Sequence, residues 1–212
     1  LASQKQVYEQ IESDMLMAEE LLPVSSNLGA SRPNKGSARA ILARLYLDWA
    51  GFPVKDNSMY TEAASSAKQV IDNAAGHGFG LGDDMGSLYT LEGRFNTESL
   101  FTIAYCNDCG LANRKHGKLG LPADYGGWQE TFAEIRFYED FPEGPRKEAT
   151  YHEAVPVDAN GNATSDVANA TNFVPWTEFK DQQNPIFRKI VGPFEDNTWP
   201  DFQSSRNDYY KR

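Results

Sequence analysis

Residues 34–51 read Asn34-Lys-Gly-Ser-Ala-Arg-Ala-Ile-Leu-Ala-Arg-Leu-Tyr-Leu-Asp-Trp-Ala-Gly51, and this stretch decides the fold class. Apolar side chains recur at helical spacing through Ala38, Leu45 and Trp49, which predicts a helix from about residue 34 to residue 50. The apolar stripe is rich in alanine, and such small residues let two helix backbones approach closely. We therefore expect this helix to pack against other helices, with Trp49 in the core.

Two more helices are predicted, one on each side of this stretch. Toward the N-terminus, Ser3 and Gln6 have the spacing of a capping box, and apolar residues follow at helical spacing until Pro23. Toward the C-terminus, a helical pattern runs from about Met59 to Ala75, and Gly76 is expected to end it. Three amphipathic helices in succession indicate stacked helical hairpins, although no strict tetratricopeptide period is visible.

The second half of the chain has a different character. Residues 98–105, Glu-Ser-Leu-Phe-Thr-Ile-Ala-Tyr, predict a strand, and residues 106–127 predict a long irregular loop of the kind that often carries function. A short helix is expected within residues 128–141, and the pair Asn160-Gly161 signals a hairpin turn.

The predicted fold class is therefore mainly α, a tetratricopeptide-like helical-repeat scaffold with long irregular loops and minor β-structure. We expect one domain over residues 1–212, incomplete at both ends. Residues 1–76 would form the helical repeats, and residues 77–212 a loop-rich portion with short strands and helices.

Composition and motifs exclude several classes of function. The net charge of -10 argues against nucleic acid as a partner, because phosphate binding needs basic patches. No apolar run is long enough to span a membrane. The motifs of serine hydrolases, P-loop proteins, zinc proteases and dinucleotide-binding proteins do not occur, so no catalytic residue and no cofactor are predicted. Carboxylate pairs such as Asp124 with Glu130 are not specific in a chain with 30 acidic residues.

The two cysteines, Cys106 and Cys109, do not predict a metal site. A structural zinc ion needs four ligands, and the three histidines are not at the spacing of a zinc finger. A thiol pair in a loop or a local disulfide is the favoured interpretation.

The order and spacing of these segments resemble the SusD/RagB family of Bacteroidetes outer-membrane lipoproteins. The resemblance rests on residues 7–14 and 18–23 in the first helix, on residues 34–51, and on several shorter segments, namely residues 60–64, 69–71, 98–105, 136–142 and 144–146. One departure concerns Arg146, because the family usually has Asp where Gly144 or Pro145 stands here. By this resemblance the chain is a central portion of the family's fold, with early and late helices outside it.

The resemblance implies a function in nutrient capture without catalysis. Proteins of this family are tethered to the cell exterior by a lipid anchor, which is not within this chain. They cover a SusC-like TonB-dependent transporter of the outer membrane and deliver glycans to it. Two alternatives stay open: capture of peptides by the same architecture, and a helical-repeat scaffold that recognises only a protein partner.

A glycan site needs flat apolar faces for the sugar ring and polar groups that fix its hydroxyls. The stretch before the predicted helix at 128–141 offers both, and in similar proteins the loop after the strand contributes to the ligand surface. Tyr125 and Trp128 are the predicted rings, with Trp176 as a further one. The predicted polar groups in the same loop are Asn107, Asp108, Asn113 and Arg114. The alternative for Trp128 and Trp176 is that they pack against the core.

Overall fold

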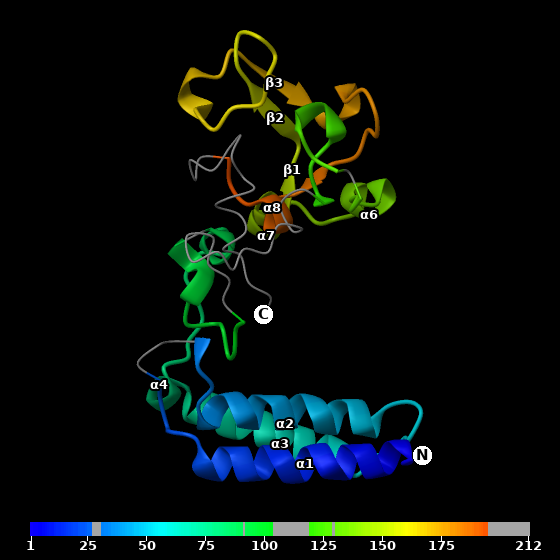
Figure 1. Ribbon diagram of the computed structural model, residues 1–212, viewed down its shortest axis with the longest axis vertical. Coiled ribbons are helices and arrows are strands. Elements are labelled where there is room, and N and C mark those ends of the chain that lie inside the picture. Colours follow the sequence, from blue (N-terminus) through cyan, green and yellow to red (C-terminus); the bar gives the residue numbers. More distant parts are fainter. Residues whose placement is uncertain (27–30, 91, 104–118, 129, 195–212) are drawn as a thin grey trace. The chain divides into compact units, whose positions relative to one another are not determined.

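The computed structural model describes residues 1–26, 31–90, 92–103, 119–128 and 130–194 (Figure 1). Its chain divides into two compact units. Unit 1 contains Leu1–Leu81 and Phe95–Thr102, and unit 2 contains Gly82–Arg94 and Ile103–Lys211. Within the described residues, no helix combines the length and the apolarity that crossing a membrane requires.

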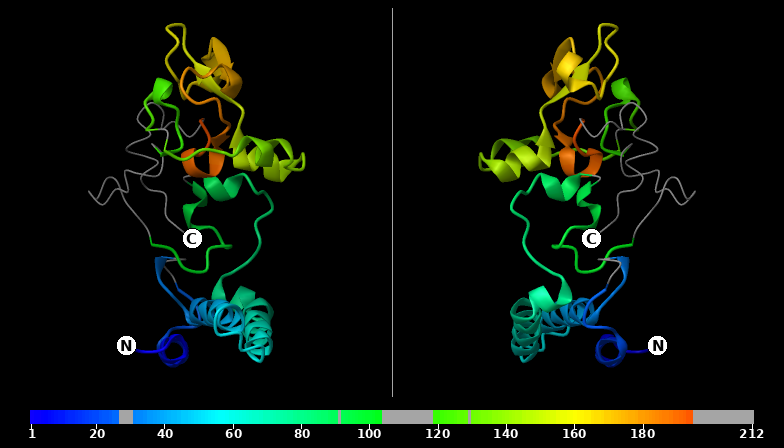
Figure 2. Two further views of the ribbon diagram at one scale, coloured as in Figure 1. Left: turned by 90° about the vertical axis from the view of Figure 1, so that its right-hand side faces the viewer. Right: turned by 90° about the vertical axis from the view of Figure 1, so that its left-hand side faces the viewer.

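Unit 1 is built on three long helices, as predicted. They are α1 (Gln4–Leu21), α2 (Lys35–Ala50) and α3 (Met59–Asp72), followed by the short α4 (Ala74–His77). Helix α2 packs against both α1 and α3 and lies between them in Figure 2, and consecutive helices run in opposite directions in Figure 1. The predicted capping box is present, because the Ser3 hydroxyl accepts a hydrogen bond from the Gln6 amide while the Gln6 side chain accepts one from the Ser3 amide.

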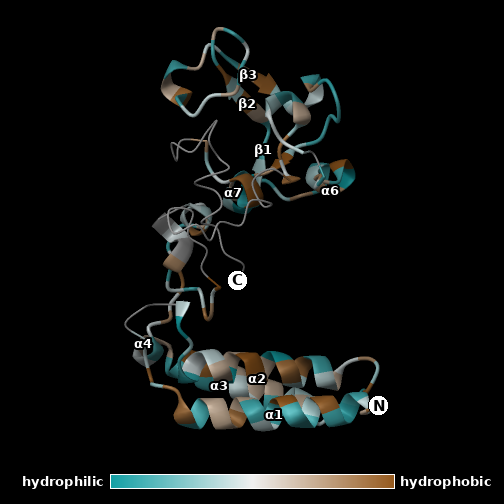
Figure 3. Ribbon diagram, in the orientation of Figure 1, coloured by the Kyte–Doolittle hydropathy of each residue, from teal (hydrophilic) through white to brown (hydrophobic). Residues whose placement is uncertain are grey.

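The middle helix carries the core of unit 1. Leu42, Leu45 and Trp49 are buried on α2, and the middle of this helix is hydrophobic in Figure 3. Tyr8 of α1 stacks on Trp49 with 5.5 Å between the ring centroids, and Ala63 of α3 closes the other side. Trp49 is 3% exposed, which confirms its predicted place in the core.

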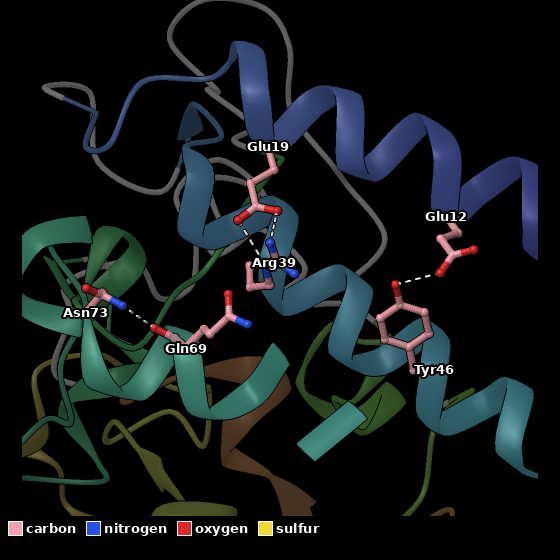
Figure 4. Close-up of polar contacts among 6 residues, drawn as sticks. All are labelled: Glu12, Glu19, Arg39, Tyr46, Gln69 and Asn73. Atoms are coloured by element: carbon pink, nitrogen blue, oxygen red, sulfur yellow. Dashed lines mark hydrogen bonds and ion pairs between the residues drawn. The ribbon is translucent and has the colours of Figure 1, made fainter. Parts of the chain in front are cut away.

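Polar contacts hold α1 against α2, although α1 has no fully buried residue (Figure 4). The Arg39 guanidinium donates through Nε to the Glu19 carboxylate at 2.8 Å, and the Tyr46 hydroxyl donates to the Glu12 carboxylate at 2.7 Å. Burial is the larger cause that raises the pKa of Tyr46, and the hydrogen bond to Glu12 raises it further. At the end of α3, the Asn73 side chain donates to the Gln69 carbonyl at 2.9 Å.

The predicted helix stop at Gly76 is wrong. α3 ends at Asp72, α4 continues through Gly76 to His77, and Gly78 ends it with a φ of 79°. The Gly78 amide donates back to the Ala75 carbonyl at 3.2 Å. A left-handed backbone at the end of a helix favours glycine. Both Gly76 and Gly78 could end the helix by this rule, and the structure uses Gly78.

The predicted strand at residues 98–105 is wrong for residues 98–102, which form no strand, whereas Ile103 stands in a β-bridge. The reason lies in the backbone partners of the segment. The Leu100 carbonyl accepts a hydrogen bond from the Ser37 hydroxyl at 2.5 Å, and the Thr97 carbonyl accepts one from the Gly80 amide at 3.1 Å. The segment thus bonds to the start of α2 and to the chain after α4. Residues 104–118, which include Cys106 and Cys109, lie outside the described residues.

Unit 2 combines short helices, short strands and irregular chain. Two antiparallel pairs are present, β1 (Tyr151–His152) with β4 (Ile186–Phe187) and β2 (Ala154–Val157) with β3 (Asn172–Pro175). The helices are α6 (Ile135–Glu139), α7 (Pro145–Thr150) and α8 (Arg188–Val191). Single turns of 3-10 helix lie at η2 (Ser87–Tyr89), η3 (Glu92–Phe95), η4 (Ala123–Tyr125), η5 (Val167–Asn169) and η6 (Trp176–Glu178). The predicted fold class, mainly α with minor β-structure, is confirmed.

Two local predictions for unit 2 have different outcomes. The hairpin turn is confirmed, because the Asp158 amide donates to the Asn162 carbonyl at 2.8 Å and Gly161 has a φ of 81°. The helix expected within residues 128–141 is correct only for α6. There the Glu134 side chain accepts a hydrogen bond from the Phe137 amide at 2.6 Å and so caps a helix that begins late.

Candidate ligand surface

The turn that precedes Trp128 is fixed by its own backbone. The Glu130 and Thr131 amides both donate to the Leu119 carbonyl, at 3.0 and 2.9 Å, which closes residues 119–131 into a loop. Gly127 lies so close to Leu121 that a Cβ atom at this position would stand 2.0 Å from the Leu121 carbonyl oxygen. Only glycine allows this approach, so the backbone on which Trp128 sits is held firmly.

Trp128 is the most exposed of the predicted ligand rings. Its side chain is 47% exposed, although it follows directly on the tightly packed Gly127. An indole that is half in solvent on a fixed turn offers an apolar face at a small cost in conformational entropy. The role of Trp128 as a ligand ring stays a prediction.

Tyr125 lies beside the core. Its ring packs edge to face on Phe179 with 5.6 Å between centroids, and it borders the hydrophobic cluster of unit 2. Burial, helped by the nearby carboxylates of Asp124 and Glu178, raises the pKa of Tyr125. The Asp124 carboxylate also accepts a hydrogen bond from the Lys180 amide at 2.7 Å. The structure thus joins η4 to the chain after η6 and makes Tyr125 a half-buried support.

Trp176 is half-buried in an aromatic cluster. Its ring lies 6.0 Å from Tyr138, which in turn lies 5.1 Å from Tyr151, both in edge-to-face geometry. It also packs against the core cluster that contains Phe179. These contacts account for Trp176 by packing, and its role as a ligand ring stays a prediction.

The remaining predicted residues cannot be placed. Asn107, Asp108, Asn113 and Arg114 lie outside the described residues. Their contribution of hydrogen bonds to a ligand stays a prediction.

Sequence reasoning missed a charged group beneath the aromatic cluster. The Tyr138 hydroxyl donates to the Glu153 carboxylate at 2.5 Å, and the Lys147 ammonium lies 4.4 Å from the centroid of the Tyr138 ring. Lys147 is itself buried and pairs with Glu143 at 2.6 Å. The Tyr138 side chain thus contacts a cation, Lys147, at its ring and a carboxylate, Glu153, at its hydroxyl. No local sequence motif predicts these two contacts.

Alkaline pH should destabilise unit 2 through Tyr138. Burial and the bond to Glu153 raise the pKa of Tyr138 from 10.0 to about 12, so folding favours the neutral phenol. This stabilisation is complete below the unfolded pKa and is lost as pH rises through the folded pKa. We expect thermal melting temperatures to fall between pH 10 and pH 12, and Tyr138→Phe to show a shallower fall than the parent protein. Equal slopes would show that other tyrosines are responsible.

Two carboxylates line one hollow of unit 2. This hollow of about 390 Å³ has Asp84, Glu148 and Arg188 in its wall. Asp84 is already engaged, because its carboxylate accepts a hydrogen bond from the Ser87 amide at 2.7 Å and so caps η2. Glycoside hydrolysis uses a pair of carboxylates, so the reaction products must be analysed in any glycan assay.

Comparison with known proteins agrees with the helical fold. Residues 2–47 match a SusD-like family model whose description is starch-binding associating with outer membrane. No curated protein matches the chain. Several solved structures are similar over nearly the whole chain. A SusD superfamily protein from Parabacteroides distasonis has 22% identity and a TM-score of 0.72, over 99% of this chain and 43% of its own.

Two further structures carry the same fold. A laminarin-binding SusD-like protein has 24% identity and a TM-score of 0.68, over 99% of this chain and 47% of its own. Surface glycan-binding protein A from Bacteroides uniformis has 18% identity and a TM-score of 0.60, over 98% of this chain and 42% of its own. The chain thus spans less than half the length of each structure. It shares the fold of these SusD-like structures, and the predicted resemblance to SusD proteins is confirmed by the family match over residues 2–47.

Proposed function

We propose that the protein containing this chain binds glycans on the outside of the outer membrane, without catalysis, and delivers them to a TonB-dependent transporter. The family description supports association with starch and the outer membrane. Of two proteins with the same fold, one is named as laminarin-binding and the other as a surface glycan-binding protein. A lipid anchor would hold the protein at the membrane, and a SusC-like transporter would be its partner.

The observation that carries the proposal is the exposed indole of Trp128 on a fixed turn. Sugar rings present C–H surfaces that stack on aromatic faces, while their hydroxyls need hydrogen-bond partners at the rim. Trp128 supplies the aromatic face, and the contact of Tyr125 with Phe179 anchors the turn to the core. Asn107, Asp108, Asn113 and Arg114 would supply the rim, and Trp176 a further ring.

Replacing Trp128 with alanine should weaken glycan binding about tenfold or more, which corresponds to about 1.4 kcal/mol. The test is calorimetric titration of the 212-residue chain with a panel that includes laminarin, xyloglucan oligosaccharides and starch, with analysis of each mixture for cleavage. The matched control is Phe52→Ala, because Phe52 is 82% exposed but belongs to unit 1.

Each outcome of this panel decides between functions. Saturable binding without cleavage that is lost in Trp128→Ala alone supports the proposal. Cleavage would show an enzyme, and the hollow at Asp84 and Glu148 would then be the first place to look. Binding of peptides in place of glycans would favour the peptide-capturing alternative, and equal loss in both variants would move the site away from Trp128.

A further inference from the structure

Unit 1 contains a small polar hollow at the start of α2, and none of the residues predicted to bind a ligand lines it. Its volume is about 260 Å³, and its wall consists of residues 25, 26, 32 and 34, residues 77–79, and residues 95–97, 99 and 100. Arg32, His77 and Ser99 are among its polar residues, and Phe79 and Phe95 are its aromatic ones. The hollow is smaller than the pockets of about 300–1,000 Å³ that hold drug-sized ligands, so it suits a single ring.

Specific contacts fix the wall of this hollow. The Asn34 side chain caps α2 and also donates to the His77 carbonyl at 2.9 Å. His77 Nδ1 lies 2.7 Å from the Val24 carbonyl oxygen, so this nitrogen carries the proton. Gly36 completes the arrangement, because a Cβ there would stand 2.6 Å from the Phe79 ring. Glycine at the first turn of α2 thus lets the segment after α4 lie directly on the helix.

The charge of the wall is unusual for this chain. Its net charge is -10, yet the hollow is lined by Arg32 and by no aspartate or glutamate. Among the residues that the structure describes, Arg32 forms no ion pair. Glu98, which stands between two lining residues in the sequence, lines a different and mainly apolar hollow. The Arg32 guanidinium thus lines the hollow without an ion-pair partner among the described residues.

One hydroxyl of the wall, that of Ser99, lacks a hydrogen-bond partner among the described residues. Ser99 is 3% exposed. A buried hydroxyl without a partner is unfavourable, and turning it toward a ligand oxygen in the hollow would remove this cost. Asn34 also places the N-terminus of α2 at the wall, where the helix dipole favours negative charge.

We propose that this hollow binds one acidic monosaccharide of the uronic acid class. Arg32 would pair with the carboxylate, which guanidinium recognises well. Phe79 and Phe95 would contact the C–H surface of the ring, and the serine, asparagine and threonine side chains of the wall would bond its hydroxyls. The proposal is independent of the Trp128 surface, since all residues of the hollow belong to unit 1.

The test compares glucuronate with glucose, which differ only at the carboxylate, by ligand-observed NMR on the 212-residue chain. We expect glucuronate to bind about tenfold more tightly or better, because a hydrogen bond to a charged group is worth that much. Arg32→Gln should remove this preference. The control Arg44→Gln should keep it, because Arg44 is an exposed arginine on α2 that pairs with Asp48. In spectra that observe the protein, ring protons of His77 should shift on titration with glucuronate.

Several results would overturn the proposal. Equal binding of the two sugars would remove the role of the carboxylate, and equal binding of acetate and glucuronate would remove the role of the sugar ring. Equal losses in Arg32→Gln and Arg44→Gln would show a general charge effect. Loss of glucuronate binding in Trp128→Ala would place the site in unit 2, whereas loss of neutral glycans alone in that variant concerns only the proposed function.

Discussion

Replacing Phe179 with alanine is expected to lower the free energy of unfolding of unit 2 by about 3–5 kcal/mol. Phe179 is 2% exposed and belongs to the buried cluster that includes Leu121 and Val155. Removing the ring leaves a cavity whose walls lose their contacts, and two short strand pairs have little capacity to close around it. The Tyr125 ring also loses its edge-to-face partner, so the turn before Trp128 should loosen.

Hydrogen exchange resolved by segment, together with urea denaturation, measures this effect. We expect faster exchange in residues 119–128 and 151–191, with residues 35–50 unchanged because they belong to unit 1. The matched control is Phe173→Ala on β3, where the ring is 51% exposed, and its effect should stay within about 0.5 kcal/mol. Equal effects of the two substitutions would show that Phe179 does not carry the core of unit 2.

The three long helices could be predicted because their signals are local. Ser3 and Gln6 are three residues apart and form a capping box. The apolar residues of α2 recur about once per helical turn. The turn at Asn160-Gly161 was predictable for the same reason, since its dihedral requirement falls on one glycine. Tertiary contacts stabilise these helices and this turn without changing where they form.

Segments whose partners are distant could not be predicted. Residues 98–103 have the composition of a strand, but their backbone bonds to Ser37, which is 63 residues from Leu100. The support of Tyr125 depends on Asp124 meeting Lys180 across 56 residues, and nothing near Tyr125 in the sequence indicates it. Tyr125 and Trp128 could be named as rings, but which of them is half-buried follows only from the fold.

The hollow at Arg32 shows the same limit for a binding site. An arginine in a polar loop has no distinguishing pattern in the sequence. Its surroundings arise because Gly36 allows Phe79 and His77 to approach α2, and because the Gly80 amide bonds the Thr97 carbonyl and so brings residues 95–100 to the same place. Close approach of side chains to a glycine, together with backbone bonds between distant segments, thus creates sites that periodicity and motif spacing do not reveal.

Replacing Gly127 with alanine should break the turn that carries Trp128, with a loss of about 3 kcal/mol in the free energy of unfolding and a loss of glycan binding. A Cβ atom at residue 127 would stand 2.0 Å from the Leu121 carbonyl oxygen and 2.4 Å from the Leu121 Cβ, so backbone must move. Leu121 is fully buried in the core of unit 2 and cannot yield without opening that core. The Gly127 amide would then leave the Pro122 carbonyl, to which it donates at 3.1 Å.

The comparison of Gly127→Ala with Trp128→Ala separates the position of the indole from its presence. The control Gly76→Ala, where no atom lies within 4 Å of the added Cβ, should be neutral or slightly stabilising because the residue lies in α4. If Gly127→Ala weakens glycan binding as much as Trp128→Ala while the indole is still present, binding depends on a turn that holds the ring in place. If Gly127→Ala lowers stability but leaves affinity intact, the ligand surface does not need this turn, and the preorganisation argument for Trp128 is wrong.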